Sequence, residues 1–396
     1  MPPDSGGDAT IAQAILKAIE QVIGPGNGRV ALHEPSFSSL ERELVMACLD
    51  SGYVSSVGAY VDEFEARLRE FTGAKHAVVV VNGTAALQVA LTLAGVEPGD
   101  EVLVPSLTFV ATANAVKHCG AFPHFVDSNT DTLGLDPAAL DEYLKGIVEA
   151  TQGVPRNRET GARISAVVPM HAFGHPVDLA GLIEVAARHR IPIVEDAAES
   201  LGSTYQGRHT GTFGLLGTLS FNGNKLVTTG GGGAILTDDP ELARHAKHLT
   251  TTAKRPHRWE FFHDEVAWNY RLPNLNAALG CAQMERLPDF LARKRLLADR
   301  YQAALQGCRG VQFVPAPSGT VSNYWLNTLR LATPDLATLD TVLAATNDAG
   351  YQCRPVWGLL HQLPMFETAP RAPLPIAAQL HASLINVPSS PQLIQD

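Results

Sequence analysis

Short apolar runs alternate with helical stretches through the middle of the chain. Val78 to Val81 is an unbroken apolar run, which is typical of a strand buried on both faces of a sheet. The turn Asn82-Gly83-Thr84 then leads into an alanine- and leucine-rich helix from Ala85 to Leu93. The alternation continues with predicted strands at Glu101–Pro105, Phe122–Asp127, Ser165–Met170 and Ile191–Glu195, and predicted helices at Thr108–Lys117 and Leu179–His189. This order predicts an α/β fold whose mainly parallel sheet is flanked by helices on both faces.

Other patterns flank this region. Near the N-terminus, isoleucines and a valine recur at helical spacing from Ile11 to Ile23, which predicts an amphipathic helix. Further helices are predicted at Ser39–Asp50, Val61–Phe71, Asn274–Leu287 and Leu291–Leu305. Beyond Gly310 short strands mix with helices, which is typical of an α+β unit. We therefore expect an N-terminal helical extension, a large α/β domain and a smaller α+β C-terminal domain, at residues 1–29, 30–287 and 288–396.

Composition narrows the class of protein. The 396 residues are 45% hydrophobic and 18% charged, as in an ordinary globular protein. A net charge of −10 argues against a general nucleic-acid binder, and no apolar run reaches the length of a membrane span. The five cysteines are scattered and never spaced as CxxC, which suits free thiols in a reducing compartment. Because the N-terminus is acidic and resembles no secretory signal, we expect a cytoplasmic protein.

Three polar features follow predicted strands or apolar runs, and ligands gather at the carboxyl ends of strands in parallel sheets. Asn82-Gly83-Thr84 opens a helix, whose free N–H groups and dipole form a phosphate cradle. Asp196 emerges from a buried strand, where a carboxylate needs a cationic partner or does chemistry. Lys225 ends a short polar loop before four consecutive glycines, with Ser220 as a second phosphate ligand. Taken singly, these residues are also explained as a capped helix start, a capping aspartate and a surface lysine.

Together the three features fit pyridoxal phosphate (PLP). This cofactor needs a lysine for its Schiff base, a carboxylate against its pyridine nitrogen and a cradle for one phosphate. Phe109 follows another strand and offers an aromatic face for the ring, although core packing explains it equally well. No GxGxxG follows a strand, which disfavours a dinucleotide. We expect no metal site, because the candidate zinc ligands lack a consistent spacing: His245, His248, His257 and His263.

Five motifs together resemble the DegT/DnrJ/StrS family of sugar aminotransferases, in the family's order and over roughly residues 30–390. They are NGTAALQVAL, VPSLTFVATANAV, VEDAAESLGSTYQG, SFNGNKLVTTGGGGAI and NYRLPNLNAALGCAQMERL. The resemblance implies the type I fold of PLP-dependent transferases, with a mainly parallel sheet and a smaller α+β domain.

The resemblance also implies a role for each matching residue. Lys225 becomes the Schiff-base lysine and Asp196 the partner of the ring nitrogen. The implied phosphate ligands are Gly83, Thr84 and Ser220, and Phe109 would stack on the ring. Asn269 resembles an asparagine that reaches the phosphate from the neighbouring subunit, which implies an obligate homodimer with shared sites. Glu199 stands where many relatives have histidine or glutamine, in a position that contacts the 3-hydroxyl of the cofactor.

Further segments resemble the branch of the family that serves legionaminate and bacillosamine-type sugars. They are VSSVGAYVDEFE, TTTAKRPHRWEFFHDE, SNYWLN and RPVWGLLHQLPMF. This resemblance implies that an amino group, usually from glutamate, is transferred to C4 of a nucleotide-linked 4-keto-6-deoxy-N-acetylhexosamine. Because the sugar nucleotide is anionic, basic residues are candidate contacts, namely Lys254, Arg255, His257 and Arg258. Tyr324 and Trp325 are expected to line the sugar or the base. A solvated loop explains the basic residues equally well.

Two other functions compete with this interpretation. A sugar dehydratase of the family uses the same cofactor, but the resemblance gives such enzymes a histidine where this chain has Lys225. A regulator without enzymatic activity would need a DNA-binding domain, for which residues 1–29 are too short and too acidic.

Overall fold

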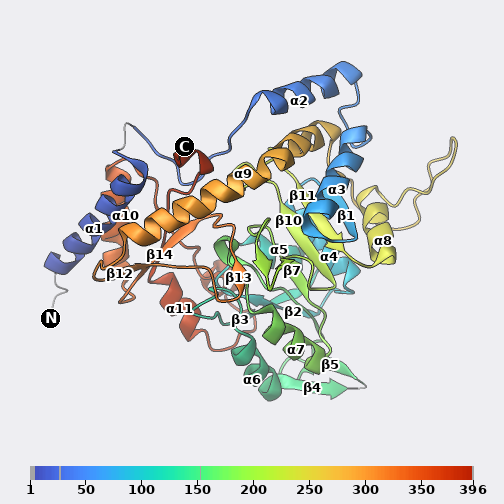
Figure 1. The fold of residues 1–396 in the computed structure, drawn as a ribbon. Coiled ribbons are helices and arrows are strands. Elements are labelled where there is room, and N and C mark those ends of the chain that lie inside the picture. Colours follow the sequence, from blue (N-terminus) through green and yellow to red (C-terminus); the bar gives the residue numbers. More distant parts are fainter. Residues whose placement is uncertain (1–4, 26–27, 152, 395–396) are drawn as a thin grey trace.

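The computed structural model describes residues 5–25, 28–151 and 153–394. Parts of the predicted N-terminal extension, residues 1–4 and 26–27, lie outside the described residues. A large α/β body and a smaller α+β unit are joined by one long helix, α9 (Asn274–Ala304), which crosses the molecule in Figure 1. No helix in the described ranges is long and apolar enough to cross a membrane. All five cysteines are free thiols.

In the part of the chain that the structure describes, seven strands form the central sheet. Parallel ladders join β3 (Phe122–Val126), β2 (Glu101–Pro105) and β6 (Ile164–Val167). Parallel bridges then connect β6 and its continuation to β7 (Val194–Asp196) and the residue before it. The order continues from β7 through β10 (Leu216–Ser220) and β11 (Gly233–Thr237) to β1 (His76–Val80), and only β11 runs antiparallel to its neighbours. The sheet is therefore mainly parallel, as predicted.

Helices cover both faces of the sheet because successive strand side chains point to opposite faces. On β1, for example, Val78 and Val80 join one core cluster while Ala77 and Val79 join another. The first face packs against α4 (Gly83–Leu93), α5 (Ala111–His118) and α8 (Pro240–Thr250). The second face packs against α3 (Ala59–Thr72), α6 (Pro137–Ile147), α7 (Leu179–His189) and α9. The helix α2 (Ser39–Ser51) lies along α9 beyond this body (Figure 1).

The smaller unit is built on an antiparallel sheet of β12 (Val311–Phe313), β14 (Asn327–Leu331), β16 (Leu384–Val387) and β15 (Arg354–Pro355). Its core includes α10 (Leu336–Asp348) and the C-terminal half of α9. The N-terminal helix α1 (Ser5–Ile23) packs against α10 and α9 (Figure 1). Ile15 and Ile19 of α1 are fully buried in this core, so the predicted amphipathic helix covers the smaller unit. Remaining elements are β4 (Val148–Thr151), β5 (Val154–Asn157), β8 (Thr204–Tyr205), β9 (Arg208–His209), β13 (Thr320–Val321) and α11 (Pro375–His381).

The prediction of two helices at Asn274–Leu287 and Leu291–Leu305 was wrong. One helix, α9, continues through Pro288. A proline inside a helix removes one hydrogen bond and usually kinks or ends it. Here Leu287, Phe290 and Leu291 are buried in the core on either side of the proline, and this packing keeps the helix continuous.

Candidate active site

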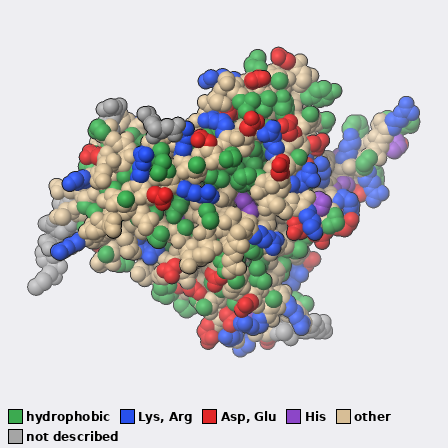
Figure 2. Space-filling view, viewed as in Figure 1, with side chains coloured by type: hydrophobic (Ala, Val, Ile, Leu, Met, Phe, Trp, Pro, Cys, Tyr) green, Lys and Arg blue, Asp and Glu red, His purple; other side chains and the backbone are tan. Residues whose placement is uncertain are grey.

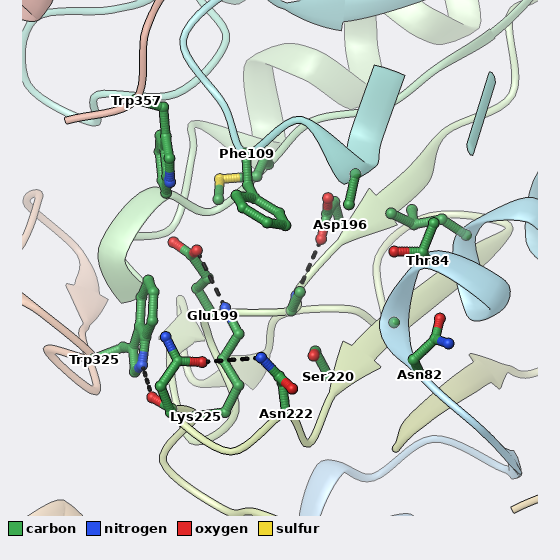
Figure 3. Close-up of a pocket in the computed structure, with 16 residues that line it drawn as sticks. Asn82, Thr84, Phe109, Asp196, Glu199, Ser220, Asn222, Lys225, Trp325 and Trp357 are labelled. Carbon is green, nitrogen blue, oxygen red and sulfur yellow. Dashed lines mark hydrogen bonds and ion pairs between the residues drawn. The ribbon is translucent and has the colours of Figure 1, made fainter. Parts of the chain in front are cut away.

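One cavity of about 340 Å³ opens at the edge of the sheet where the parallel strands end. Because β1, β7 and β10 point the same way, the residues that follow them meet at this edge. The cavity is lined by Gly83 and Thr84 after β1, Asp196 at the end of β7, and Ser220 and Lys225 at and after β10. Figure 3 shows Thr84 and Asn82 on one side of the cavity and Trp325 and Trp357 on the other. The features predicted separately from the sequence therefore share one site.

The first turn of α4 forms one wall of the cavity. The Asn82 side chain accepts the Ala85 N–H at 2.8 Å, and the Asn82 carbonyl accepts the Ala86 N–H at 3.1 Å. Since the first N–H groups of a helix have no partner within the helix, those of Gly83 and Thr84 stay available to a ligand. A bound anion is stabilised there by these groups and by the helix dipole.

Glycines bring this wall close to the neighbouring strands. A Cβ on Gly83 would lie 3.0 Å from the Ser220 Cβ, and a Cβ on Gly233 would lie 2.6 Å from the Asn82 backbone. Glycine is therefore required for the close approach of the α4 turn to β10 and β11. At Gly230 the backbone φ of +78° also favours glycine. The run of four glycines serves both close packing and a left-handed turn.

Asp196 is a buried carboxylate with two hydrogen bonds. Its side chain accepts the Thr112 hydroxyl at 2.8 Å and the Ala198 N–H at 3.2 Å. Burial raises the pKa of Asp196, although these hydrogen bonds and the nearby Lys225 act in the opposite direction. A cationic ring nitrogen placed against this carboxylate would stabilise its charged form.

Lys225 lies between a carboxylate and an aromatic ring. Its Nζ is 3.2 Å from Glu199 Oε1 and 3.8 Å from the centre of the Trp325 ring. The other oxygen of Glu199 accepts the Phe173 N–H at 2.9 Å. Burial raises the pKa of Glu199 to about 7, against the opposing effect of Lys225. The amine is thus held in place and faces the same cavity as Asp196.

These residues fit PLP. The glycine-walled turn offers two N–H groups and the Ser220 side chain to a phosphate, while Asp196 and Lys225 line the same cavity. Phe109 is half exposed and also lines this cavity, as expected for a residue that stacks on a bound ring rather than packing in the core. The sequence profile of the DegT/DnrJ/EryC1/StrS aminotransferase family matches residues 35–396. The chain belongs to this family. It is a PLP-dependent aminotransferase with the type I fold of PLP-dependent transferases.

Relatives extend over nearly the whole of this aminotransferase. The GDP-perosamine synthase of Caulobacter vibrioides is 36% identical over 362 residues, which are 91% of this chain and 93% of that protein. EpsN of Bacillus subtilis, a putative pyridoxal phosphate-dependent aminotransferase, is 36% identical over 341 residues, 86% of this chain and 84% of that protein. The crystal structure of the aminotransferase TlmJ from Streptoalloteichus hindustanus superposes with a TM-score of 0.84 at 30% identity, covering 93% of this chain and 95% of that one. The more specific resemblance to the legionaminate and bacillosamine branch stays a prediction.

Two residues of the SNYWLN segment anchor the aminotransferase site and were not predicted from the sequence. The Asn323 amide donates to the carbonyls of Glu199 and Leu201, both at 2.9 Å, and the Ser322 hydroxyl donates to the Gly174 carbonyl. Trp325 lines the cavity as predicted, and its indole N–H donates to the Asn224 carbonyl at 2.8 Å. The neighbouring Tyr324 lies elsewhere, since its hydroxyl accepts the Ala316 N–H in the smaller unit. Trp357, quoted in the RPVWGLL segment but given no role, is a further wall of the cavity.

The predicted basic contacts lie on an exposed arm, residues 251–269. Lys254, Arg255, His257 and Arg258 are all exposed and do not line the cavity of their own chain. Asn269, at the base of the arm opposite Thr251, is exposed as well. Figure 1 shows the arm projecting from the body beyond α8, and Figure 2 shows Lys, Arg and His side chains along it. Within one chain, the structure therefore keeps these predicted residues apart from the cavity.

Proposed function

We propose that this enzyme transfers an amino group from glutamate to C4 of a nucleotide-linked 4-keto-6-deoxy-N-acetylhexosamine, for bacterial glycan or nonulosonic acid biosynthesis. The main support is the single cavity that unites Lys225, Asp196 and the phosphate cradle and is closed on the other side by two tryptophans. Aromatic walls suit the apolar faces of a sugar ring. Relatives named for the synthesis of GDP-perosamine support a substrate linked to a nucleotide.

Each residue has a proposed role in holding the cofactor or moving a proton. The N–H groups of Gly83 and Thr84 and the Ser220 hydroxyl hold the phosphate, Phe109 stacks on the ring, and Glu199 faces the 3-hydroxyl. Bound PLP would supply an electron sink for the carbon that carries the amine, and Asp196 would support this by keeping the ring nitrogen protonated. Lys225 would hold the cofactor through its amine and would act as the general base that takes the proton from the α-carbon of glutamate. The same amine returns a proton to C4 of the sugar in the second half of the cycle.

The working unit is proposed to be a homodimer whose sites are shared. Among the described residues that line the cavity, Lys225 is the single lysine or arginine, although the substrate carries phosphates. The arm holds further basic side chains away from its own body, and it exposes Trp259, Phe261 and Val266 by 69%, 79% and 97%. Large apolar side chains exposed to this degree indicate a contact surface. A second copy of this chain would cover them, and its arm would bring Asn269, Lys254, Arg255, His257 and Arg258 to the cavity.

A coupled assay tests the function. The enzyme loaded with PLP is incubated with glutamate and a GDP- or UDP-linked 4-keto-6-deoxy sugar, while 2-oxoglutarate and the sugar product are followed by mass spectrometry. We expect an amino sugar and one equivalent of 2-oxoglutarate from at least one nucleotide series, and neither product from Lys225→Ala. Loss of the sugar 3-hydroxyl without 2-oxoglutarate would instead indicate a dehydratase. No reaction with any 4-keto sugar would count against the proposal.

A further inference from the structure

Lys294 is a lysine with no exposed surface that lies outside the cavity. It is in the middle of α9, and its Nζ donates hydrogen bonds to the carbonyls of Trp325, at 2.7 Å, and Ser389. Burying an ammonium group without a carboxylate partner is costly, and burial lowers the pKa of Lys294 well below its ordinary value. No ion pair to Lys294 occurs among the described residues. An apolar side chain would fill the same space without this cost, so the lysine needs another explanation.

The two hydrogen bonds of Lys294 lead directly to the candidate Schiff-base lysine. The carbonyl of Trp325 accepts a hydrogen bond from Lys294. The indole N–H of Trp325 donates to the carbonyl of Asn224, which is the residue before Lys225. The ring of Trp325 also lies 3.8 Å from Lys225 Nζ. Thus Trp325 contacts both the backbone of the lysine loop and the amine of Lys225. Lys294 in turn binds the backbone carbonyl of Trp325.

His33 gives an independent link between the two lysines. Its imidazole is buried, and a backbone hydrogen bond with Asn224, the residue before Lys225, acts to raise its pKa. Burial lowers its pKa well below the ordinary value, and the charges of Lys294 and of Lys225 lower it further. The positive charges of both amines therefore act on the same imidazole. An imidazole is neutral or cationic, so His33 cannot serve as an anionic partner of Lys294.

We propose that Lys294 is a positioning residue for Lys225, which acts by clamping the backbone of Trp325 so that the indole holds the Asn224 carbonyl and covers the Lys225 amine. This role rests on the proposed function of Lys225. Two groups stabilise positive charge on the Lys225 nitrogen, namely the Trp325 ring and the Glu199 carboxylate at 3.2 Å. Asp196 and His33 are the other titratable groups near it. If Lys294 acts through Trp325, removing Lys294 weakens the contact between the Trp325 ring and the Lys225 nitrogen. That nitrogen then releases its proton at a lower pH.

The visible absorbance of PLP bound to Lys225, titrated from pH 5 to 10, reports this proton. We expect the midpoint of Lys294→Met to fall by roughly half to one pH unit relative to the wild type. Trp325→Phe, which lacks the indole N–H, shifts it in the same direction. The double variant shifts no further, because both changes remove the same link. Arg300→Met is the matched control on the same helix, since Arg300 is exposed and does not line the cavity, and we expect this variant to keep the wild-type midpoint.

Several results would overturn this role. An unchanged midpoint in folded Lys294→Met would show that the lysine only fills space. A rise would show that Lys294 acts by its charge and not by position. Additive shifts in the double variant would show that Lys294 does not act through Trp325. Where Lys294→Met fails to fold, an unchanged midpoint in Trp325→Phe refutes the route by itself. The wild type is expected to show a pH-dependent absorbance band that is missing in Lys225→Ala. If it shows no such band, the proposed function of Lys225 and this inference both fail. The other results concern Lys294 alone.

Discussion

Glu199 shows what burial does to a single carboxyl group in this site. Its pKa of about 7 in the folded protein lies above its ordinary value of 4.5, because the folded state holds its proton more tightly. The contribution of protonated Glu199 to the free energy of unfolding is therefore fully present below pH 4.5 and is lost as the pH rises through 7. We expect the free energy of unfolding of the cofactor-free wild type to fall by up to about 3 kcal/mol over this window, relative to Glu199→Gln.

Urea unfolding at a series of pH values measures this difference. Glu184→Gln is the control, since Glu184 is exposed on α7, and its profile is expected to follow the wild type. Parallel profiles for Glu199→Gln and the wild type would show that Glu199 is ionised in the folded protein at pH 5.

Asp196 has a different role, which a second variant tests. We expect Asp196→Asn to fold and to lose ~10²–10⁴-fold in turnover, because the amide cannot hold a proton on the ring nitrogen. Steady-state kinetics with saturating PLP measures the loss, and circular dichroism checks the fold. Turnover near the wild-type rate would reduce Asp196 to a cap for the turn at Ala198, whose N–H it accepts.

Site residues that lie close together in a short motif, such as Ser220 and Lys225, could be predicted from the sequence. The residues that bind and orient the site side chains could not. Thr112 is 84 residues from the Asp196 that it binds, and Asn323 is 124 residues from Glu199. Nothing local marks such partners, because they are chosen by the folded chain. Lys294 was hidden for the same reason, since a lysine in a helix is ordinarily exposed.

At the scale of elements, the contact between β11 and the start of α4 carries a prediction. In Gly233→Ala the new Cβ would lie 2.6 Å from the Asn82 backbone and push the phosphate cradle away from β11. We expect PLP to be retained at least about 10-fold more weakly, with a stability loss of about 1–3 kcal/mol. Gly223→Ala, on the loop that carries Lys225, is the matched control because its Cβ would meet no atom within 4 Å. Equal PLP dissociation constants for the two variants would contradict this account of the cradle.

The elements themselves were predictable where the hydrophobic pattern was regular. The βαβ alternation predicted β1, β2, β3 and the helices between them, because each strand is buried on both faces. The pattern failed at α9, where a proline normally signals a break. Burial of the residues around Pro288 overrides that local preference, and such burial is visible only in the folded chain.

For the whole molecule, the proposed shared site predicts complementation between two defective copies. Lys225→Ala lacks the amine, and Asn269→Asp places a negative charge where the partner's cofactor phosphate is expected. When the two proteins exchange subunits, one site of each mixed dimer has both an intact lysine and an intact asparagine. We therefore expect up to about a quarter of the wild-type activity to return, the statistical share of intact sites in an equimolar mixture. Mass spectrometry confirms the mixed dimers, and their presence without any activity would show that each site belongs to one chain.

The position of α1 affects how the protein is made. In the described part of the chain, Ile15 and Ile19 belong to the core of the smaller unit, and α10 is synthesised roughly 300 residues after α1. At about 5–20 residues per second, the ribosome needs roughly 15–60 s to deliver that partner. Throughout this time the nascent chain carries an amphipathic helix with an uncovered apolar face, while the α/β body can already fold. The helix α1 is thus among the last elements to pack in the folded protein. Chaperones that bind apolar segments therefore have the longest time to bind this helix.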